Sequence, residues 1–228
     1  MAHRYEEILQ TLSGRISTLE AGARIPTEKE LAAEFDASSM TVRRALQILT
    51  QNGQLRGVRG RGTFVAHPRV TKMMGSAASF TDAMRSCGRR PSSVLVEAAI
   101  RQATPEEAQW FGAPPGTQVY SIKRVRLGDG TPLGFEVTHL RAQLFPGLLA
   151  ANLEQSLYDI LATQYDIAIV RTSIVVSTRC PTLNEAEHLG IEPTMPCLQT
   201  IVTSETGDGA LFEHTVSIFR GDLYEISL

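Results

Sequence analysis

The chain has 228 residues, 43% of them hydrophobic and 20% charged, with a formal net charge of -2. This length accommodates a small domain and a second globular domain of about 150 residues with its own core. No apolar run approaches the ~18 to 20 residues of a membrane span, and the N-terminus lacks a signal-peptide pattern, so we expect a cytoplasmic protein with no membrane partner.

The first predicted elements are two short helices joined by a tight turn. Thr27 stands three residues before Glu30, which is the spacing of a capping box, and this pair starts a helix directly behind Pro26. Asp36-Ala37-Ser38 ends that helix, because these residue types favour turns and caps.

A second helix follows at once, capped by Ser38 or Ser39. Its apolar residues Val42, Leu46 and Leu49 recur at i, i+4 and i+7, which places them together on the buried face. Two short helices in this order are typical of a helix-turn-helix motif. The polar side chains on the other faces of the second helix are then free to meet DNA; they are Thr41, Arg43, Arg44 and Gln47.

A basic, glycine-rich hairpin is predicted after the second helix. Residues 55–59 and 63–66 have the pattern of two strands, joined across Gly60-Arg61-Gly62. The glycines let the backbone approach a DNA groove closely, and the arginines supply charge for phosphates or for a narrow minor groove. Taken alone, the segment fits an ordinary surface hairpin equally well, but the helix pair before it favours the wing of a winged helix-turn-helix.

Charge placement supports a nucleic-acid partner more strongly than the total charge does. The net charge and a pI near 6.2 argue weakly against such a partner. Residues 39–72, however, contain seven basic side chains and no Asp or Glu. A local basic face is what phosphate binding needs, because association is driven by counterions displaced near the contact. We therefore predict that this part of the chain binds double-stranded DNA.

The rest of the chain is expected to form a separate domain. We predict a DNA-binding domain over residues 1–68, a linker over 69–78 and a second domain over 79–228. The second domain contains an internal duplication at an offset of about 77 to 78 residues. Ser79 begins the segment SFTDAMRSCG, which parallels the segment SLYDILATQY that begins at Ser156.

Each copy of the duplication has the pattern helix, strand, helix, strand, strand. Two related halves of this kind predict one six-stranded antiparallel sheet with pseudo-twofold symmetry, helices packed against it and a cleft where the halves meet. The local signals are capping boxes, Asp-Gly turns between paired strands and glycines at helix ends. They are Ser79 to Asp82, Thr104 to Glu107, Ser156 to Asp159, Thr182 to Glu185, Asp129-Gly130, Asp208-Gly209, Gly112 and Gly190.

The N-terminal motifs resemble the GntR-type winged-helix domain of bacterial transcription regulators. An amphipathic helix over Tyr5 to Ile16, then RIPTEKELAAEF, MTVRRAL and GVRGRGTFV, carry this resemblance across about the first 66 residues. It implies DNA contacts from the head of the second helix, the recognition helix and the wing tip. The family usually has arginine just before MTVR, where this chain has Ser39, so the operator sequence stays open. The expected DNA contacts are Lys29, Ser39, Thr41, Arg43, Arg44, Arg59, Gly60 and Arg61.

Residues 76–228 are similar to the UTRA effector-binding domain, which follows a GntR-type domain in the HutC branch of the family and shares the chorismate lyase fold. The resemblance rests on SFTDAMRSCGRRPSS, KRVRLGDGTPLGFE, SLYDIL and FEHTVSIFRGDLYEI. It implies an α+β protein in which a winged helix-turn-helix domain precedes a chorismate lyase-like domain with a six-stranded antiparallel sheet. It also implies that this domain binds a small-molecule effector, dimerises and alters operator affinity.

Charged residues on two paired strands are the main candidates for effector recognition. Arg124 and Arg126 alternate on one strand face, so their guanidinium groups are placed to converge on one anionic group. Glu136, on the hairpin partner, is placed to accept hydrogen bonds from hydroxyl or amine groups. A simpler interpretation of the same residues is an exposed strand face on which they form ion pairs with one another.

Helix starts supply a second candidate anion site. Free backbone amides and the positive end of the helix dipole at Ser79, Thr81 and Ser156 favour phosphate or carboxylate, although simple helix capping explains these residues equally well. Resemblance to sugar-phosphate-responsive UTRA proteins implies ligand contacts from several of these positions, with two aromatic residues completing the wall. The expected effector contacts are Ser79, Thr81, Arg124, Arg126, Glu136, Ser156, Phe219 and Tyr224.

Cysteine and histidine give no sign of catalysis or metal binding. Cys87, Cys180 and Cys197 lack any paired spacing, and the five histidines are scattered without a His-x3-His pair or a nucleophile motif. We expect no cofactor and no metal. Trp110 is expected to pack in the core under its short helix.

These observations favour a DNA-binding repressor that works as a homodimer on a pseudo-palindromic operator and responds to a small anionic metabolite such as a sugar phosphate. Two recognition helices one helical turn apart read two half-sites more tightly than one. A chorismate lyase-like enzyme is the alternative, but it has no use for a basic winged helix. A nonspecific architectural DNA binder is disfavoured because residues 69–228 carry 13 basic and 17 acidic side chains.

Overall fold

The computed structural model describes residues 2–58, 60–66, 70–73, 79–167, 171–207 and 209–227, without the side chains of residues 2–4, 72 and 73. The chain divides into two compact units, Met1–Arg69 and Val70–Leu228. Within the described part of the chain, no helix is both long enough and apolar enough to cross a membrane.

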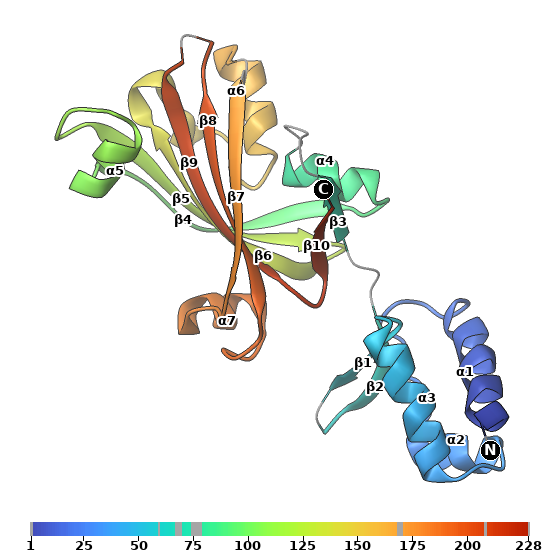
Figure 1. Ribbon diagram of the computed structural model, residues 1–228. Helices are drawn as coiled ribbons and strands as arrows, with labels where there is room; N and C mark the ends of the chain where they lie inside the picture. The colour runs from blue at the N-terminus through green and yellow to red at the C-terminus, as the bar shows by residue number, and fades with distance from the viewer. Residues whose placement is uncertain are drawn as a thin grey trace. The chain divides into compact units, whose positions relative to one another are not determined.

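The described residues of the N-terminal unit form three helices followed by a two-stranded hairpin (Figure 1). Both predicted caps form: Thr27 and Glu30 make a complete capping box, and Ser38 rather than Ser39 caps the third helix. The predicted buried face of that helix packs in the core of the unit. The elements are α1 (Ala2–Ile16), α2 (Glu28–Glu34), α3 (Ser39–Gln51), β1 (Leu55–Val58) and β2 (Gly62–Val65).

The hairpin has the form of a wing. β1 and β2 pair in antiparallel register from Leu55 opposite Val65 to Val58 opposite Gly62. Gly60 lies in the turn with a φ of 74°, a conformation that glycine adopts without strain. A helix pair followed by such a hairpin is a winged helix-turn-helix.

The C-terminal unit is built on a six-stranded antiparallel sheet with the strand order β4-β5-β6-β9-β8-β7. Each half contributes a helix, an edge strand, a second helix and a hairpin, as the duplication predicts. The first half is α4 (Phe80–Ser86), β4 (Pro91–Gln102), α5 (Pro105–Trp110), β5 (Gln118–Gly128) and β6 (Thr131–Arg141). The second half is α6 (Leu157–Tyr165), β7 (Arg171–Arg179), α7 (Leu183–Leu189), β8 (Cys197–Glu205) and β9 (Leu211–Arg220).

The pseudo-twofold axis passes between the two central strands, β6 and β9. Thr138 and Thr215, which are 77 residues apart, lie opposite each other there, and their hydroxyl groups are 3.1 Å apart. Three of the four predicted capping boxes are complete, whereas Ser156 caps Asp159 by its own hydroxyl alone. Asp208, expected in the second hairpin turn, lies outside the described residues.

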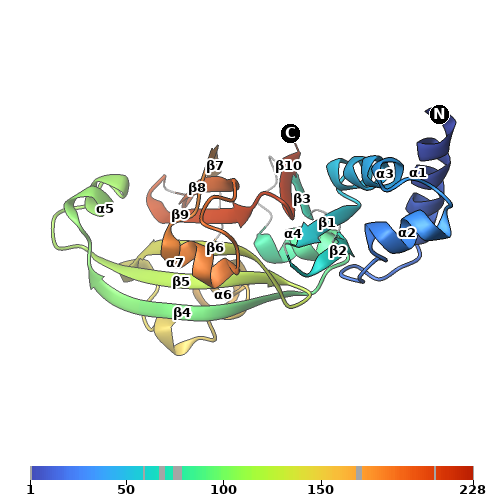
Figure 2. The ribbon, with the colours of Figure 1, turned by 90° about the horizontal axis from the view of Figure 1, so that it is seen from below.

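Helices cover the two faces of the sheet differently. One face packs against α4, α6 and two short 3-10 helices, η1 (Ala142–Leu144) and η2 (Leu148–Ala150). On the other face, Leu189 of α7 packs against Phe135 and Ile218. Figure 2 shows α5 at one end of the sheet and α4 at the other.

The structure differs from the expected linker at residues 69–78. Within this range, β3 (Val70–Met73) pairs in parallel with the C-terminal strand β10 (Tyr224–Ser227), and Val70 is fully buried. Its partner strand lies about 150 residues away in sequence. Local periodicity therefore cannot predict this pairing. Residues 69 and 74–78 lie outside the described residues.

Candidate DNA-binding surface and effector pocket

Most predicted DNA contacts are exposed side chains on the N-terminal unit. Lys29 stands in the first turn of α2, Ser39 begins α3, and Arg61 follows Gly60 at the wing tip. Helix ends, a recognition helix and a basic hairpin are the parts that winged-helix domains place on phosphates and in grooves. Arg59 lies outside the described residues.

The arginines of α3 already have partners within the unit. Arg43 donates from Nε and Nη2 to the Glu28 carboxylate, with Nη2 2.8 Å from Oε2, and this pairing raises the pKa of Arg43. The Arg44 guanidinium lies 4.5 Å from the centroid of the Tyr5 ring on α1. Sequence reasoning missed both partners. These contacts orient the two arginines at the helix surface before any DNA is bound.

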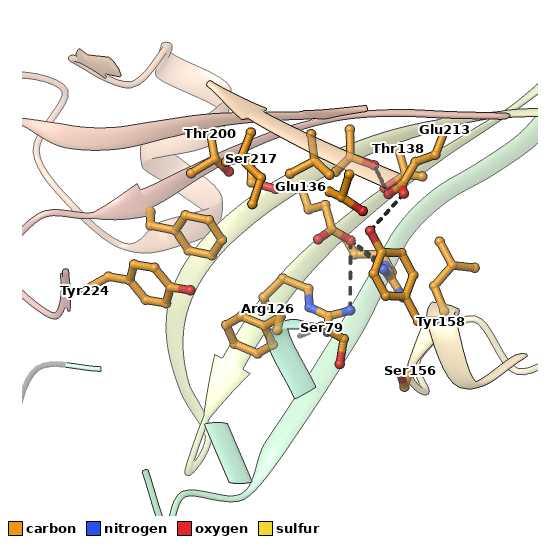
Figure 3. Close-up of a pocket in the computed structure, with 18 residues that line it drawn as sticks. Ser79, Arg126, Glu136, Thr138, Ser156, Tyr158, Thr200, Glu213, Ser217 and Tyr224 are labelled. Atoms are coloured by element: carbon orange, nitrogen blue, oxygen red, sulfur yellow. Dashed lines mark hydrogen bonds and ion pairs between the residues drawn. The ribbon is translucent and has the colours of Figure 1, made fainter. Parts of the chain in front are cut away.

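A pocket opens on the sheet face that carries α4 and α6 (Figure 3). Its enclosed cavity has a volume of about 60 Å³, within about 680 Å³ of space that includes open solvent. Thr81 lies beside it, with its hydroxyl 3.5 Å from Arg126 Nη2. The other predicted effector residues all line the pocket: Ser79, Arg124, Arg126, Glu136, Ser156, Phe219 and Tyr224.

The structure corrects the interpretation of these charged residues as an exposed, ion-paired strand face. Arg124 and Arg126 are each only 3% exposed and Glu136 is 9% exposed, because they face the interior side of the sheet. Ser79 and Ser156 do cap their helices, yet they also line the pocket. Capping and pocket lining are therefore compatible roles for the same two hydroxyl residues.

Arg124 is committed to contacts within the protein. It pairs with Glu136 through Nε and Nη2. Its Nη1 donates to the carbonyl oxygens of Leu153 and Gln155, at 3.0 and 3.1 Å, and so holds the loop that leads into α6. Arg124 thus positions Glu136 and the start of α6.

Arg126 retains unused donors. Among the described residues, its Nε and Nη1 have no hydrogen-bond partner, although Nη1 lies 3.9 Å from Glu136. Burial lowers the pKa of Arg126 to about 10, and the nearby Glu136 opposes that shift. Its guanidinium lies 4.6 Å from the centroid of the Phe80 ring. A buried cation with free donors that faces a cavity is suited to binding an anion.

An aromatic stack forms the wall next to Arg126. Phe219 stacks on Tyr224 with ring centroids 4.1 Å apart, and Phe80 lies 6.2 Å from Phe219. The Tyr224 hydroxyl is buried and has no partner in the part of the chain that the structure describes. Figure 3 shows this hydroxyl directed into the pocket. It is a further group available to a ligand.

Sequence reasoning missed a buried carboxylate on the opposite side of the pocket. Glu213 accepts hydrogen bonds from the hydroxyls of Tyr158 at 2.8 Å, Ser204 at 2.6 Å and Thr215 at 2.7 Å. Burial raises the pKa of Glu213. The signal was present in the duplication, because FEVT at residues 135–138 recurs as FEHT at residues 212–215. Glu213 is therefore the counterpart of Glu136.

The described residues contain no group of three or more His, Cys, Asp and Glu side chains arranged to hold a metal ion. His139 and His214 lie opposite each other on the sheet face away from the pocket, where burial lowers the pKa of both. Trp110 stacks on His214, with ring centroids 3.8 Å apart. His139, His214 and Trp110 are therefore packed against their neighbours as structural side chains.

Both halves of the chain match known protein families. Residues 4–65 match the family of bacterial regulatory proteins of the gntR type, and residues 86–225 match the UTRA domain. The chain is 33% identical over 222 residues to the HTH-type transcriptional repressor NagR of Bacillus subtilis, which covers 96% of this chain and 91% of that protein.

Two further relatives span all or nearly all of the chain. The crystal structure of PhnF from Mycobacterium smegmatis superposes with a TM-score of 0.71 at 30% identity, covering 96% of this chain and 98% of that one. The mannosyl-D-glycerate transport/metabolism system repressor MngR of Escherichia coli is 28% identical and covers 100% of this chain and 97% of that protein. Because NagR and MngR are named as repressors, the enzyme alternative loses its support. The chain belongs to the gntR family of bacterial transcription regulators and carries a UTRA domain.

Proposed function

We propose that this regulator is a repressor that binds a pseudo-palindromic operator as a homodimer and changes its operator affinity when a small anionic metabolite, such as a sugar phosphate, occupies the pocket. The observation that carries the effector class is Arg126, a buried guanidinium with two unused donor nitrogens facing the cavity. An anionic group there satisfies donors that the described residues leave unpaired.

The rest of the pocket supports a ligand with hydroxyl or amine groups as well as an anion. Glu136 and Glu213 place carboxylates on two sides of the cavity, and both recur at the same point of the two halves. Ser79 and Ser156 bring helix N-termini to its rim. Such a mixture of one cation with unused donors and several acceptors fits a phosphorylated or acidic sugar better than a purely apolar compound. The relative named for mannosyl-D-glycerate supports a sugar derivative as the effector class.

For DNA we propose contacts from α2, α3 and the wing, with Arg43 reading a base or a phosphate. The exposed Ser39 leaves the first position of α3 with a short hydroxyl in place of the arginine usual in the family. We therefore expect an operator that differs from those of relatives with arginine there.

The test begins with selection of binding sites from a pool of random duplexes, followed by operator titration with and without candidate effectors. The panel comprises hexose 6-phosphates, hexonates, the matching neutral sugars and inorganic phosphate. We expect a symmetric selected site and a change of operator affinity with anionic sugars but not with neutral ones. Absence of sequence enrichment would contradict the regulator, and a response to neutral sugars alone would contradict the anionic effector.

A further inference from the structure

The recognition helix α3 presents a large apolar side chain to solvent near its N-terminal end. Met40 is the second residue of α3, is 71% exposed and lies outside the core that the described residues of this unit form. The other large apolar residues of the predicted helix face, Val42, Leu46 and Leu49, are all buried in that core. Packing within the unit therefore does not explain a methionine at this position.

The place of Met40 on the helix suits it to contact a DNA base. In helix-turn-helix proteins, the N-terminal residues of the recognition helix contact base edges in the major groove. Side chains of a helix lean towards its N-terminus, so a long side chain in the first turn projects towards the end that enters the groove. The adjacent residues Ser39 and Thr41 have short side chains. Met40 therefore reaches further from the start of the helix than the residues beside it.

The arginines one turn further along α3 are held in place by contacts within the unit. Arg43 Nη2 lies 2.8 Å from the Glu28 carboxylate, and the Arg44 guanidinium lies 4.5 Å from the centroid of the Tyr5 ring. The two arginines follow Met40 by three and four residues, so all three side chains share one side of the helix. This side therefore combines two oriented cations, which suit phosphates or guanine edges, with one apolar side chain at its leading end.

The chemistry of the major groove leaves few favourable partners for a thioether side chain. All four bases present hydrogen-bond donors or acceptors there, and thymine alone adds an apolar group, its C5 methyl. Methionine has no side-chain donor, and its sulfur is only a weak acceptor, so it gains little from the polar base edges. Contact with a thymine methyl, in contrast, removes apolar surface of both partners from water.

We propose that Met40 contacts the C5 methyl group of a thymine in the major groove and thereby determines one base position of each operator half-site. This contact rests on the operator binding of the proposed function, and it names a chemical group that the operator must carry. A 5-methylcytosine at the same position should satisfy Met40 as well, because its methyl group is also attached to C5.

Replacement of single thymines by deoxyuridine tests the contact, since uracil lacks only the methyl group. The starting duplex is the operator selected by the wild-type protein, and each thymine of one half-site is replaced in turn. At one position the wild type should lose about fourfold in affinity, which is the effect of burying one methyl group. Met40→Ala should bind the thymine and uracil duplexes equally at that position. Affinity is measured by fluorescence anisotropy at one fixed salt concentration, because DNA binding depends strongly on salt.

Two further variants separate loss of the contact from a general effect of the substitution. Leu19→Ala removes an apolar side chain that is 40% exposed in the same unit but lies outside α3, and it should keep the wild-type difference between thymine and uracil. Met40→Leu keeps an apolar side chain at the helix start and should retain part of the difference. Met40→Ala itself should fold, because the native side chain is exposed and alanine favours helices.

A second readout uses the methyl group on a different base. The chosen thymine–adenine pair is replaced by 5-methylcytosine–guanine or by cytosine–guanine, which differ only in the methyl group. The wild type should bind the methylated duplex about fourfold more tightly than the unmethylated one, and Met40→Ala should not distinguish them.

The methyl contact is wrong, while the regulator stands, if the wild type binds its selected operator but senses no thymine methyl. The same conclusion follows if Met40→Ala senses the methyl group as strongly as the wild type, or if it no longer binds any operator, since one methyl contact is too small to account for that loss. If no operator sequence is selected at all, the proposed function fails and this contact fails with it.

Discussion

At the scale of the residue, the two pocket arginines have different roles although they share one strand face. Arg124 donates hydrogen bonds to Glu136 and to the backbone carbonyl oxygens before α6. Two donor nitrogens of Arg126, in contrast, have no partner among the described residues. Removing one member of a buried ion pair leaves an uncompensated charge and costs roughly 3 to 5 kcal/mol. Substitutions of Arg124 should therefore destabilise the fold or distort the pocket. Substitutions of Arg126 should instead change the binding of the ligand.

Arg126→Gln should retain operator binding and lose the response to the effector, because the cavity keeps its shape but loses its cation. The measurement is operator affinity with and without the panel compound that shifts the wild-type protein. Lys123→Gln is the matched control: it lies on the same strand and pairs with the exposed Glu97 at 2.8 Å. An Arg126→Gln protein that responds like the Lys123→Gln protein would remove Arg126 from the binding site.

Removal of the Tyr224 hydroxyl should lower the affinity for the effector without lowering the stability of the protein. A buried hydroxyl without a partner lowers stability, so Tyr224→Phe should leave the free energy of unfolding unchanged or raise it by about 1 kcal/mol. Effector affinity should fall, by about tenfold if the hydroxyl donates to a charged group. Tyr165→Phe is the control, since that hydroxyl donates to the Pro146 carbonyl away from the pocket. Unchanged effector affinity in Tyr224→Phe would show that the hydroxyl does not contact the ligand.

Arg43 is the residue through which the DNA surface is tested. Arg43→Ala should cost about 1 to 3 kcal/mol of operator binding and relax the preference at one base position, provided that Arg43 reads a base. Arg15→Ala removes the same charge from the same unit, where Arg15 pairs with Glu34 outside the predicted contact set. Equal losses in the two variants, measured by operator titration, would show a general charge effect in place of a specific contact.

At the scale of the element, local signals predicted helices and turns well. Capping boxes located the starts of α2, α4, α5 and α7, because each rests on two residues three positions apart. The pairing of β3 with β10 could not be predicted in this way, since it depends on a contact between opposite ends of the C-terminal unit. The pocket followed the same division: strand alternation indicated Arg126, while the hydrogen bonds that occupy Arg124 required the fold.

The start of α5 gives a pH test of one element. The Arg101 guanidinium and the Thr104 amide hold the pKa of Glu107 at about 2, below its usual value of 4.5. A lowered carboxylate pKa stabilises the fold above pH 4.5, and that contribution is lost as the pH falls from 4.5 towards about 2. Glu107→Gln should therefore be less stable than the wild type at neutral pH, and the difference should shrink across this window.

The readout is denaturant unfolding followed by fluorescence of Trp110, the single tryptophan, which lies at the end of α5. Glu106→Gln, at the exposed neighbouring position, is the control and should follow the wild type. A Glu107→Gln protein whose stability changes with pH in parallel with the wild type would contradict the assigned ion pair.

At the scale of the whole molecule, the lining of the pocket packs against the first residue of the C-terminal unit. Val70 begins the C-terminal unit and packs in one cluster with Phe80, Phe219 and Tyr224, three residues that line the pocket. The side chains that line the pocket beside Arg126 therefore also pack against β3 and α4. A ligand alters DNA binding only through different affinities for the DNA-competent and DNA-incompetent states.

This coupling predicts that the effector and the operator change each other's affinity for the protein equally. If the effector weakens operator binding by some factor, the operator must weaken effector binding by the same factor, because both ligands act on one equilibrium. Effector affinity is measured by calorimetry with the free protein and with the protein saturated by its selected operator, and operator affinity is measured with and without saturating effector. A scrambled duplex, which the protein does not bind specifically, is the control and should leave effector affinity unchanged. Factors that disagree beyond error would show that the effect is not a linkage on one protein, for example because the effector binds the DNA. Equal factors in the wild type that fall to one in Arg126→Gln would tie the Arg126 pocket to the winged helix as one thermodynamic unit.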